Sequence, residues 1–158
     1  MKIVTAMLIA LSSLALVAGC STETPSTEAD SVTVREAWVK ATDTGMTSAF
    51  AEIQNTGESQ VRVVSAASPA SSMMELHEVV SAADGSMVMK PKEGGFTVAA
   101  EQTKILQAGG DHFMLMDVTS PLTPGNDTDI TLTFEDGSSS TFTAQVREFP
   151  GAEENYGG

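Results

Sequence analysis

Short stretches in which apolar and polar residues alternate constrain the fold of this chain more than any other feature. Residues 130–135 read ITLTFE and residues 142–146 read FTAQV, so every second side chain is apolar. Val61 and Val63 flank Arg62 in the same way. A period of two is typical of strands that bury one face. The sequence therefore predicts several half-buried strands.

Turn-forming residues separate these stretches, and no long helical pattern interrupts them. The turn signals are Asn55-Thr56-Gly57, Asp84-Gly85, Gly94-Gly95, Gly109-Gly110, Pro124-Gly125-Asn126 and Glu135-Asp136-Gly137. Many short strands joined by such turns predict an all-β, antiparallel sandwich or barrel. The single tryptophan, Trp38, is expected to fill the core near the first strand, since burial is the commonest use of an indole.

Before the strands come two segments that do not belong to the fold. Residues 1–19 have a basic start, an apolar run and small residues before Cys20, a pattern typical of a lipoprotein signal peptide. We expect Cys20 to be lipidated and residues 20–31, rich in Ser, Thr and Pro, to form a flexible tether. Residues 32–148 are then the folded domain, and residues 149–158 a flexible tail.

Composition narrows the range of partners and the location. The formal charge is −13, from 21 acidic and eight basic residues, which argues against nucleic acid as a partner. Cys20 is the only cysteine, so the mature domain has no thiolate for a nucleophile or a metal. The signal predicts a periplasmic or extracytoplasmic protein held to the membrane by lipid. Ser21, by resemblance to lipoprotein sorting rules, favours the outer membrane if the cell has one.

Six of the nine methionines and both histidines lie between residues 73 and 116. They are Met73, Met74, Met87, Met89, Met114 and Met116, with His77 and His112. A single methionine is usually a core residue, and a lone histidine is usually a polar surface group. The clustering of all eight favours a shared function over eight separate ones.

Strand geometry sorts these residues by face. Side chains two apart in a strand point to the same side, so in the run HFMLM (residues 112–116) the histidine and both methionines share one face, while the other two residues face the core. Met87 and Met89 share a face for the same reason. Imidazole and thioether form a soft, neutral ligand set, which favours Cu(I) over zinc, calcium or magnesium.

The runs MELHEVV (74–80), GSMVMKP (85–91) and LQAGGDHFMLMDV (106–118), followed by PLTPG and ITLTFEDGSS, resemble the PCu(A)C family of periplasmic copper chaperones. The resemblance spans nearly all of residues 32–146. It implies a cupredoxin-like antiparallel β-sandwich that binds one Cu(I) at an exposed site. It also implies delivery of copper to an accepting protein, for the copper centre of cytochrome c oxidase. By the same resemblance, His77, Met89, His112 and Met114 are the expected ligands.

The spacing of these residues departs from the family motif by one residue in each interval. The motif has ten residues between the first histidine and the methionine, then 21 before His-x-Met, whereas 11 and 22 residues lie in these intervals here. Choosing Met87 in place of Met89 gives nine and 24, which fits worse. Extra residues in turns are well tolerated. Met87 is the alternative ligand, and Met116 an auxiliary one.

Other functions lack the residues that they need. A blue-copper centre requires a cysteine thiolate, and zinc hydrolases require more histidines or a His-Glu-x-x-His motif. No Gly-x-Ser-x-Gly nucleophile motif is present. We therefore expect a copper chaperone and no enzyme. The alternative is a lipid-anchored protein-interaction module whose methionines form an adaptable contact patch.

Overall fold

Ten β-strands make up most of residues 26–149, the part of the chain that the computed structural model describes. A single 3₁₀ turn, η1 (Ala29–Ser31), precedes them. The strands are β1 (Val32–Lys40), β2 (Gly45–Asn55), β3 (Val61–Ala67), β4 (Met74–Ser81), β5 (Met87–Pro91), β6 (Phe96–Val98), β7 (Thr103–Leu106), β8 (His112–Val118), β9 (Asp127–Phe134) and β10 (Ser139–Arg147). Among these residues no helix has the length and apolarity needed to cross a membrane.

The expected signal peptide, Cys20 and the tail beyond Phe149 lie outside the described residues. Of the expected tether, residues 26–31 are described, and they contact the turn between β9 and β10. The backbone N–H of Glu28 donates to Asp136 Oδ2 at 2.8 Å, and that of Ala29 donates to Ser138 Oγ at 3.0 Å. The contacts of the domain therefore extend at least to Glu28.

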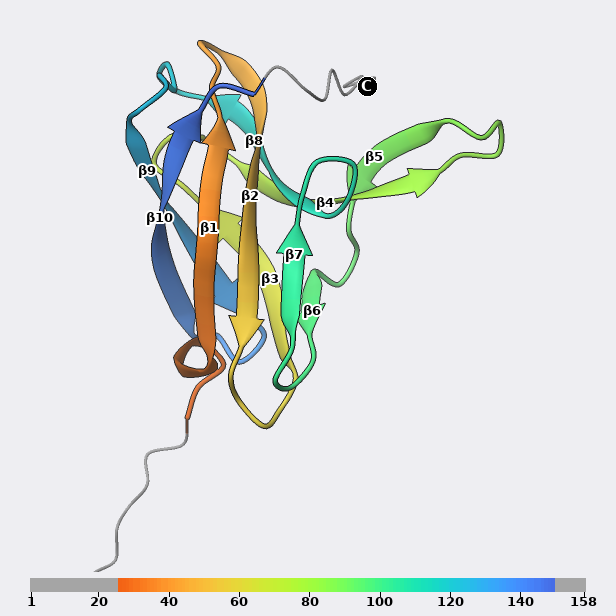
Figure 1. The fold of residues 1–158 in the computed structure, drawn as a ribbon, viewed down its shortest axis with the longest axis vertical. Coiled ribbons are helices and arrows are strands. Elements are labelled where there is room, and N and C mark those ends of the chain that lie inside the picture. The colour runs from red at the N-terminus through yellow and green to blue at the C-terminus, as the bar shows by residue number, and fades with distance from the viewer. Residues whose placement is uncertain (1–25, 150–158) are drawn as a thin grey trace, which may run out of the picture.

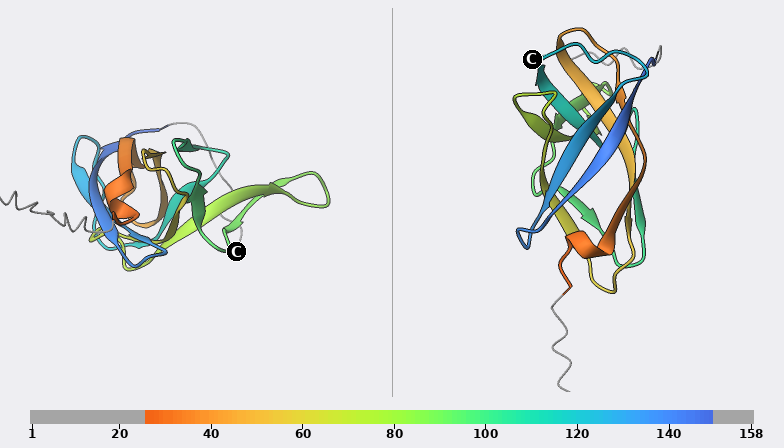
Figure 2. Two further views of the ribbon diagram at one scale, coloured as in Figure 1. Left: turned by 90° about the horizontal axis from the view of Figure 1, so that it is seen from below. Right: turned by 90° about the vertical axis from the view of Figure 1, so that its left-hand side faces the viewer.

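The strands form one continuous sheet in the order β5-β4-β8-β2-β1-β10-β9-β3-β6, and β7 pairs with the far half of β2. The sheet curls over so that β3 and β9 lie behind β1 and β2 (Figure 1), which is clearest from below (Figure 2). Among the described pairs only β1 and β10 run parallel. The predicted all-β sandwich is confirmed, and the parallel pair makes its sheet mixed.

Alternating strands supply the core, as their sequences predicted. On β9, Ile130, Leu132 and Phe134 are buried, and on β10 Ala144 and Val146 are buried beside them. Burying an apolar side chain of this size contributes roughly 1.5–3 kcal/mol relative to leaving it exposed. The buried side chains specify the register of β9 and β10, because a slip of one residue would turn all of them toward solvent.

Trp38 is not in this core, contrary to the expectation from sequence. On β1, Val32 and Val34 face the core, but the register shifts between Arg35 and Trp38, where Glu36 adopts a positive φ of 49°. Such a bulge inserts a residue and reverses which side chains face inward. Val39 is therefore buried in the core, and Trp38 turns to the outer face.

A hairpin made of β4 and β5 projects from the body of the domain (Figure 1). β4 pairs with β8 only from Met74 to His77, and from His77 onward it pairs with β5. The hairpin therefore leaves the main sheet at His77. His77 therefore lies at the junction between the body of the domain and the projecting hairpin.

Candidate metal centre

The two histidines of the chain are direct neighbours across β4 and β8. The register pairs His77 with His112, so both imidazoles project from the same face of the sheet. Their ring centroids lie 5.6 Å apart, edge to face. His77 is 7% exposed and His112 is 0% exposed. Two residues that are 35 positions apart in sequence thus form one buried pair.

Met114 lies on the same face, one step along β8 from His112. It pairs with Glu75 of β4 and with Ser48 of β2. The hydroxyl of Ser48 donates to the Met114 sulfur at 3.7 Å, and the side chain is 1% exposed. The neighbouring Phe113 and Leu115 lie in the core, as the alternation predicted.

The hairpin places Met89 closer to the histidines than Met87. Met89 pairs with Val79, two residues beyond His77, so it occupies the diagonal position, where side chains lie roughly 7–8 Å apart. Met87 pairs with Ser81 farther along the arm and is 60% exposed. Met116 lies beyond Met114 on β8, on the side away from the histidines. His77, Met89, His112 and Met114 are thus brought together, whereas Met87 and Met116 lie at the margins.

Of the remaining methionines in the cluster, Met74 packs against the core and Met73 is exposed.

An aromatic row covers the β8 side of the histidine pair. The ring of Phe50 lies 6.2 Å from that of His112, and Trp38 lies 4.6 Å from Phe50. Phe149 packs on the other side of Trp38 at 5.3 Å. Trp38 and Phe50 are neighbours across β1 and β2, which brings their rings together. The bulge that turns Trp38 out of the core therefore also places it in this aromatic row. The histidines are therefore buried more deeply than expected for the exposed site that the family resemblance implies.

His77 has one satisfied and one unsatisfied ring nitrogen. Nε2 lies 2.7 Å from Glu75 Oε2, whereas Nδ1 is buried and has no hydrogen-bond partner among residues 26–149. A buried polar atom without a partner is costly, and in native proteins it often marks a place for a ligand or an ion. This nitrogen, beside a second imidazole and thioether sulfurs, fits a soft metal ion.

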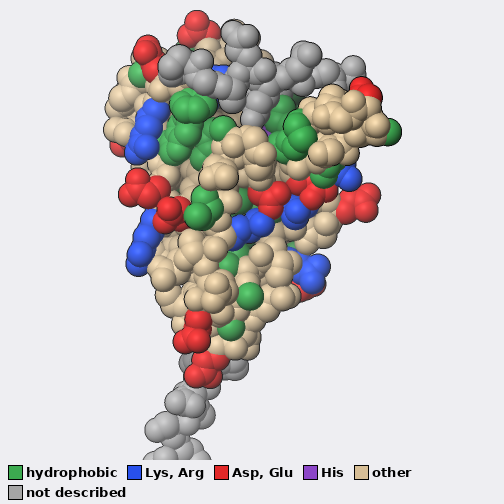
Figure 3. Space-filling model, turned by 45° about the vertical axis from the view of Figure 1, so that its right-hand side comes forward, with side chains coloured by type: hydrophobic (Ala, Val, Ile, Leu, Met, Phe, Trp, Pro, Cys, Tyr) green, Lys and Arg blue, Asp and Glu red, His purple; other side chains and the backbone are tan. Residues whose placement is uncertain are grey.

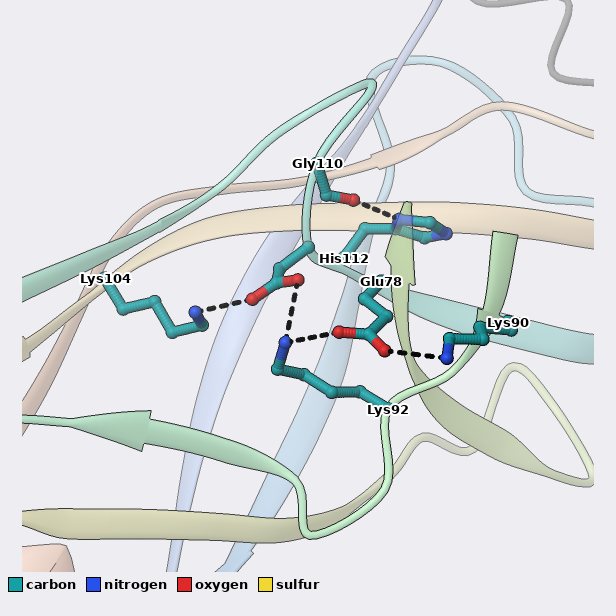
Figure 4. Close-up of polar contacts among 7 residues, drawn as sticks. Glu78, Lys90, Lys92, Lys104, Gly110 and His112 are labelled. Atoms are coloured by element: carbon teal, nitrogen blue, oxygen red, sulfur yellow. Dashed lines mark hydrogen bonds and ion pairs between the residues drawn. The ribbon is translucent and has the colours of Figure 1, made fainter. Parts of the chain in front are cut away.

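A chain of ion pairs lies under the site, on the opposite face of the hairpin. Glu78 Oε2 lies 2.7 Å from Lys92 Nζ, and Lys90 Nζ lies 3.5 Å from the other carboxylate oxygen. Lys92 also lies 3.5 Å from Asp111, which in turn pairs with Lys104 of β7 (Figure 4). These ion pairs connect the β4–β5 hairpin to the rest of the domain at Asp111, the residue before His112.

The ion pair between Glu78 and Lys92 shifts the pKa of both groups. The hydrogen bond from Lys92 holds the pKa of Glu78 below its usual value. Desolvation raises this pKa, but the charges of Lys92 and Lys90 lower it further. The hydrogen bond to Glu78 correspondingly raises the pKa of Lys92, and the charge of Asp111 adds to this. In Figure 3 acidic and basic side chains lie next to one another across this face.

Glu75 and the ion pairs were not predicted from the sequence. Glu75 lies two residues before His77 on the same strand, so the period of two was the signal that could have placed its carboxylate beside the imidazole. The ion pairs carried a weaker signal. Glu78, Lys90 and Asp111 each adjoin an expected ligand, but only the strand register shows that they meet.

Comparison with known proteins supports one family assignment. The family described as "Putative lipoprotein LpqE-like" matches residues 32–146. The "Putative lipoprotein Lxx21020" of Leifsonia xyli subsp. xyli (strain CTCB07) is 43% identical over 155 residues, which cover 98% of this chain and 93% of that protein.

Solved structures with a similar fold include PCuAC domains and CuI-DR1885 from Deinococcus radiodurans. The copper-bound PCuAC domain from PmoF2 has a TM-score of 0.61, with 75% of this chain and 93% of that domain covered. Its identity is only 17%, so this likeness concerns the fold. CuI-DR1885 from Deinococcus radiodurans is 27% identical, with a TM-score of 0.54 over 76% of this chain and 82% of that protein. The chain belongs to the LpqE-like lipoprotein family and has the cupredoxin-like β-sandwich fold of PCuAC domains.

Proposed function

We propose that this protein is a copper chaperone that binds one Cu(I) as cargo through His77, Met89, His112 and Met114, and releases it to a partner protein. The observation that carries the proposal is the β4–β8 register, which pairs the two histidines and leaves Met114 and Met89 on the same face. The fold shared with copper-bound domains supports it, as does the 27% identity to CuI-DR1885.

The ligand set suits Cu(I) for chemical reasons. Thioether sulfur and neutral imidazole are soft donors that need not lose a proton to bind, and Cu(I) prefers such donors. The buried Nδ1 of His77 supplies a lone pair that no protein group uses. Two buried histidines also keep water away from the ion, which suits a reduced metal.

Release of the metal is expected to begin at the hairpin. Met89 is only half-buried and lies on the projecting arm, whereas His112 and Met114 are covered within the body. A partner's ligand can therefore replace Met89 first, without unfolding the sandwich. By the family resemblance, the accepting protein belongs to the assembly of the cytochrome c oxidase copper centre. The acidic charge of the chain would speed encounter with a basic acceptor, an effect that added salt weakens.

We further propose that Cys20 carries the lipid that holds the domain outside the cytoplasm. The lipoprotein description of the family and of the Leifsonia relative supports this anchoring. Mass spectrometry of the membrane-associated protein tests it, and Cys20→Ser should abolish both the lipid mass and the membrane association.

The alternative function, an interaction module with a methionine contact patch, has weaker support. Met114 is buried and Met74 packs against the core. Within residues 26–149 only Met46, Met73 and Met87 are well exposed among the methionines. An adaptable contact surface requires exposed methionines. The burial instead favours a site that closes around an ion.

A competition titration with Cu(I) tests the chaperone proposal. The protein from Ser21 onward, which keeps all ten strands, is titrated anaerobically against a chromophoric chelator of Cu(I). We expect one tightly bound copper, which His77→Ala abolishes because it removes a donor from the buried pair. Met89→Leu removes a ligand, so it should weaken binding by at least the roughly tenfold that the loss of a group supporting a ligand typically costs.

Met87→Leu is the matched control, since Met87 lies on the same strand and face two residues away. It should leave the affinity unchanged. Equal losses for Met87→Leu and Met89→Leu would contradict the assignment of Met89. Binding by the wild type no stronger than that of an unrelated acidic protein would exclude the chaperone function and leave the interaction module.

A further inference from the structure

The ring of His77 is held in one orientation by Glu75. Glu75 lies two residues earlier on β4 and pairs across the sheet with Met114, so its carboxylate is on the face of the candidate metal centre. Its Oε2 lies 2.7 Å from Nε2 of His77, and its side chain is about one-third exposed. The carboxylate thus stands between solvent and the buried imidazole.

This contact decides which nitrogen of His77 carries the proton. A carboxylate oxygen only accepts hydrogen bonds, so Nε2 must be the donor. A second proton on Nδ1 would leave a buried N–H without an acceptor, since that atom has no partner among the described residues. In the neutral ring, the proton is therefore on Nε2 and the lone pair on Nδ1.

His112 has the opposite tautomer. Its Nδ1 lies 2.9 Å from the carbonyl oxygen of Gly110 (Figure 4), and a carbonyl oxygen also only accepts. The proton therefore lies on Nδ1, and the neutral ring has its lone pair on Nε2. The two histidines of the pair present different nitrogens.

We infer that Glu75 is a positioning residue for the copper site: it fixes the tautomer of His77, so that His77 binds the metal through Nδ1 and His112 binds it through Nε2. This inference rests on the proposed function. A carboxylate that accepts the second ring N–H of a ligating histidine orients the ring and makes its free nitrogen a better donor. Glu75 does this for His77, as the Gly110 carbonyl does for His112.

Nitrogen NMR of the metal-free protein tests the tautomers directly. The chain has only two histidines, so two-bond ¹H–¹⁵N spectra of the ¹⁵N-labelled protein from Ser21 onward show only two ring patterns. We expect His77 to show the Nε2–H tautomer in the wild type and a mixture of tautomers in Glu75→Leu. Glu75→Gln, which keeps an acceptor oxygen, should retain the wild-type pattern in most molecules. An unchanged pattern in Glu75→Leu would overturn the inference.

Copper affinity and the Cu(I)-bound spectrum provide the second test. Glu75→Leu should weaken Cu(I) binding on the order of ten- to a hundredfold, with partial recovery in Glu75→Gln. Glu58→Leu removes the same charge from an exposed loop at the far end of β2, so it should leave the affinity unchanged. In the loaded wild type, the metal-induced shift of His77 should fall on Nδ1.

The outcomes separate this inference from the proposed function. A wild type that binds no copper refutes the proposed function, and the role of Glu75 in copper binding falls with it. If Glu75→Leu binds copper as tightly as the wild type, only the positioning role is refuted. A shift on Nε2 of His77 in the loaded protein also refutes only that role.

Discussion

Asn55 and His77 are both buried polar side chains, on β2 and β4, but the fold satisfies only one of them. Asn55 is completely buried, and its amide nitrogen donates to three carbonyl oxygens, those of Ser59, Val98 and Ala99, at 2.8–3.1 Å. His77 makes one hydrogen bond, and its Nδ1 is buried without any partner among the described residues.

The contrast separates a structural polar residue from one that we propose to bind metal. Asn55 joins the end of β2 to the loops after β2 and β6, and each of its bonds is completed within the chain. Of the two ring nitrogens of His77, only Nε2 has a hydrogen-bond partner among the described residues. Because an unsatisfied buried group lowers stability, its presence at the junction of body and hairpin points to a role outside folding. Substitutions at the two positions should therefore have opposite consequences for stability and for copper binding.

Asn55→Ala should have the largest effect on stability. It removes three hydrogen bonds from the amide nitrogen, one of them to the buried carbonyl of Val98, and also the bond that the Gly57 N–H donates to Asn55 Oδ1. The free energy of unfolding should therefore fall by about 3 kcal/mol. Copper affinity of the folded protein should not change, because Asn55 lies at the opposite end of β2 from Ser48. Urea unfolding and the Cu(I) titration measure the two quantities.

Thr141→Ala is the control for Asn55→Ala, since it removes only an exposed hydrogen bond to Thr131. Its cost should stay within about 0.5 kcal/mol. A comparable cost for the two substitutions would mean that the buried bonds of Asn55 contribute little.

Sequence patterns predicted much of the fold because the alternation records which face is buried. The strands around Ile130 and Ala144 follow it throughout. The bulge in β1 does not, because nothing in the composition near Glu36 favours the positive φ found there, and this reverses the expected direction of Trp38. A bulge depends on how β1 meets β2, which a local pattern does not contain.

The candidate site was predictable in its residue types but not in its partners. Alternation placed His112 and Met114 on one face, which the structure confirms. That His77 faces His112 depends on the register of two distant strands, and the family resemblance, not the pattern itself, joined them. The contact of His77 with Glu75 follows from their spacing on one strand, but a carboxylate is not a soft ligand, so Glu75 was not part of the predicted Cu(I) site.

Lys92→Met should have an intermediate effect, because it breaks the ion pairs that tie the hairpin to the body. Lys92 is 27% exposed and bonds both Glu78 and Asp111, so we expect a loss of about 1 kcal/mol. The pKa of Lys92 is raised above its ordinary 10.5, so its contribution is fully present below that pH and is lost as the pH rises through the folded-state pKa.

The difference in unfolding free energy between wild type and Lys92→Met, measured by urea at pH 7 and in strongly alkaline solution, tests this expectation. It should disappear at the alkaline end. Lys90→Met is the control, since Lys90 is 55% exposed and makes only a 3.5 Å contact with Glu78. A larger loss for Lys90→Met than for Lys92→Met would contradict the role of the partly buried Lys92–Glu78 pair.

Of the three substitutions at Asn55, Lys92 and His77, His77→Leu should change stability least, and it should still abolish copper binding. Leucine has a similar volume and no polar atom, so it removes the unsatisfied Nδ1 while giving up one hydrogen bond to Glu75, a carboxylate that water can reach. These two changes oppose each other, and the free energy of unfolding should change by less than about 1 kcal/mol. Urea unfolding and the Cu(I) titration again give both values. If His77→Leu cost as much stability as Asn55→Ala, His77 would be a structural residue like Asn55, and the unsatisfied nitrogen would not mark a binding site.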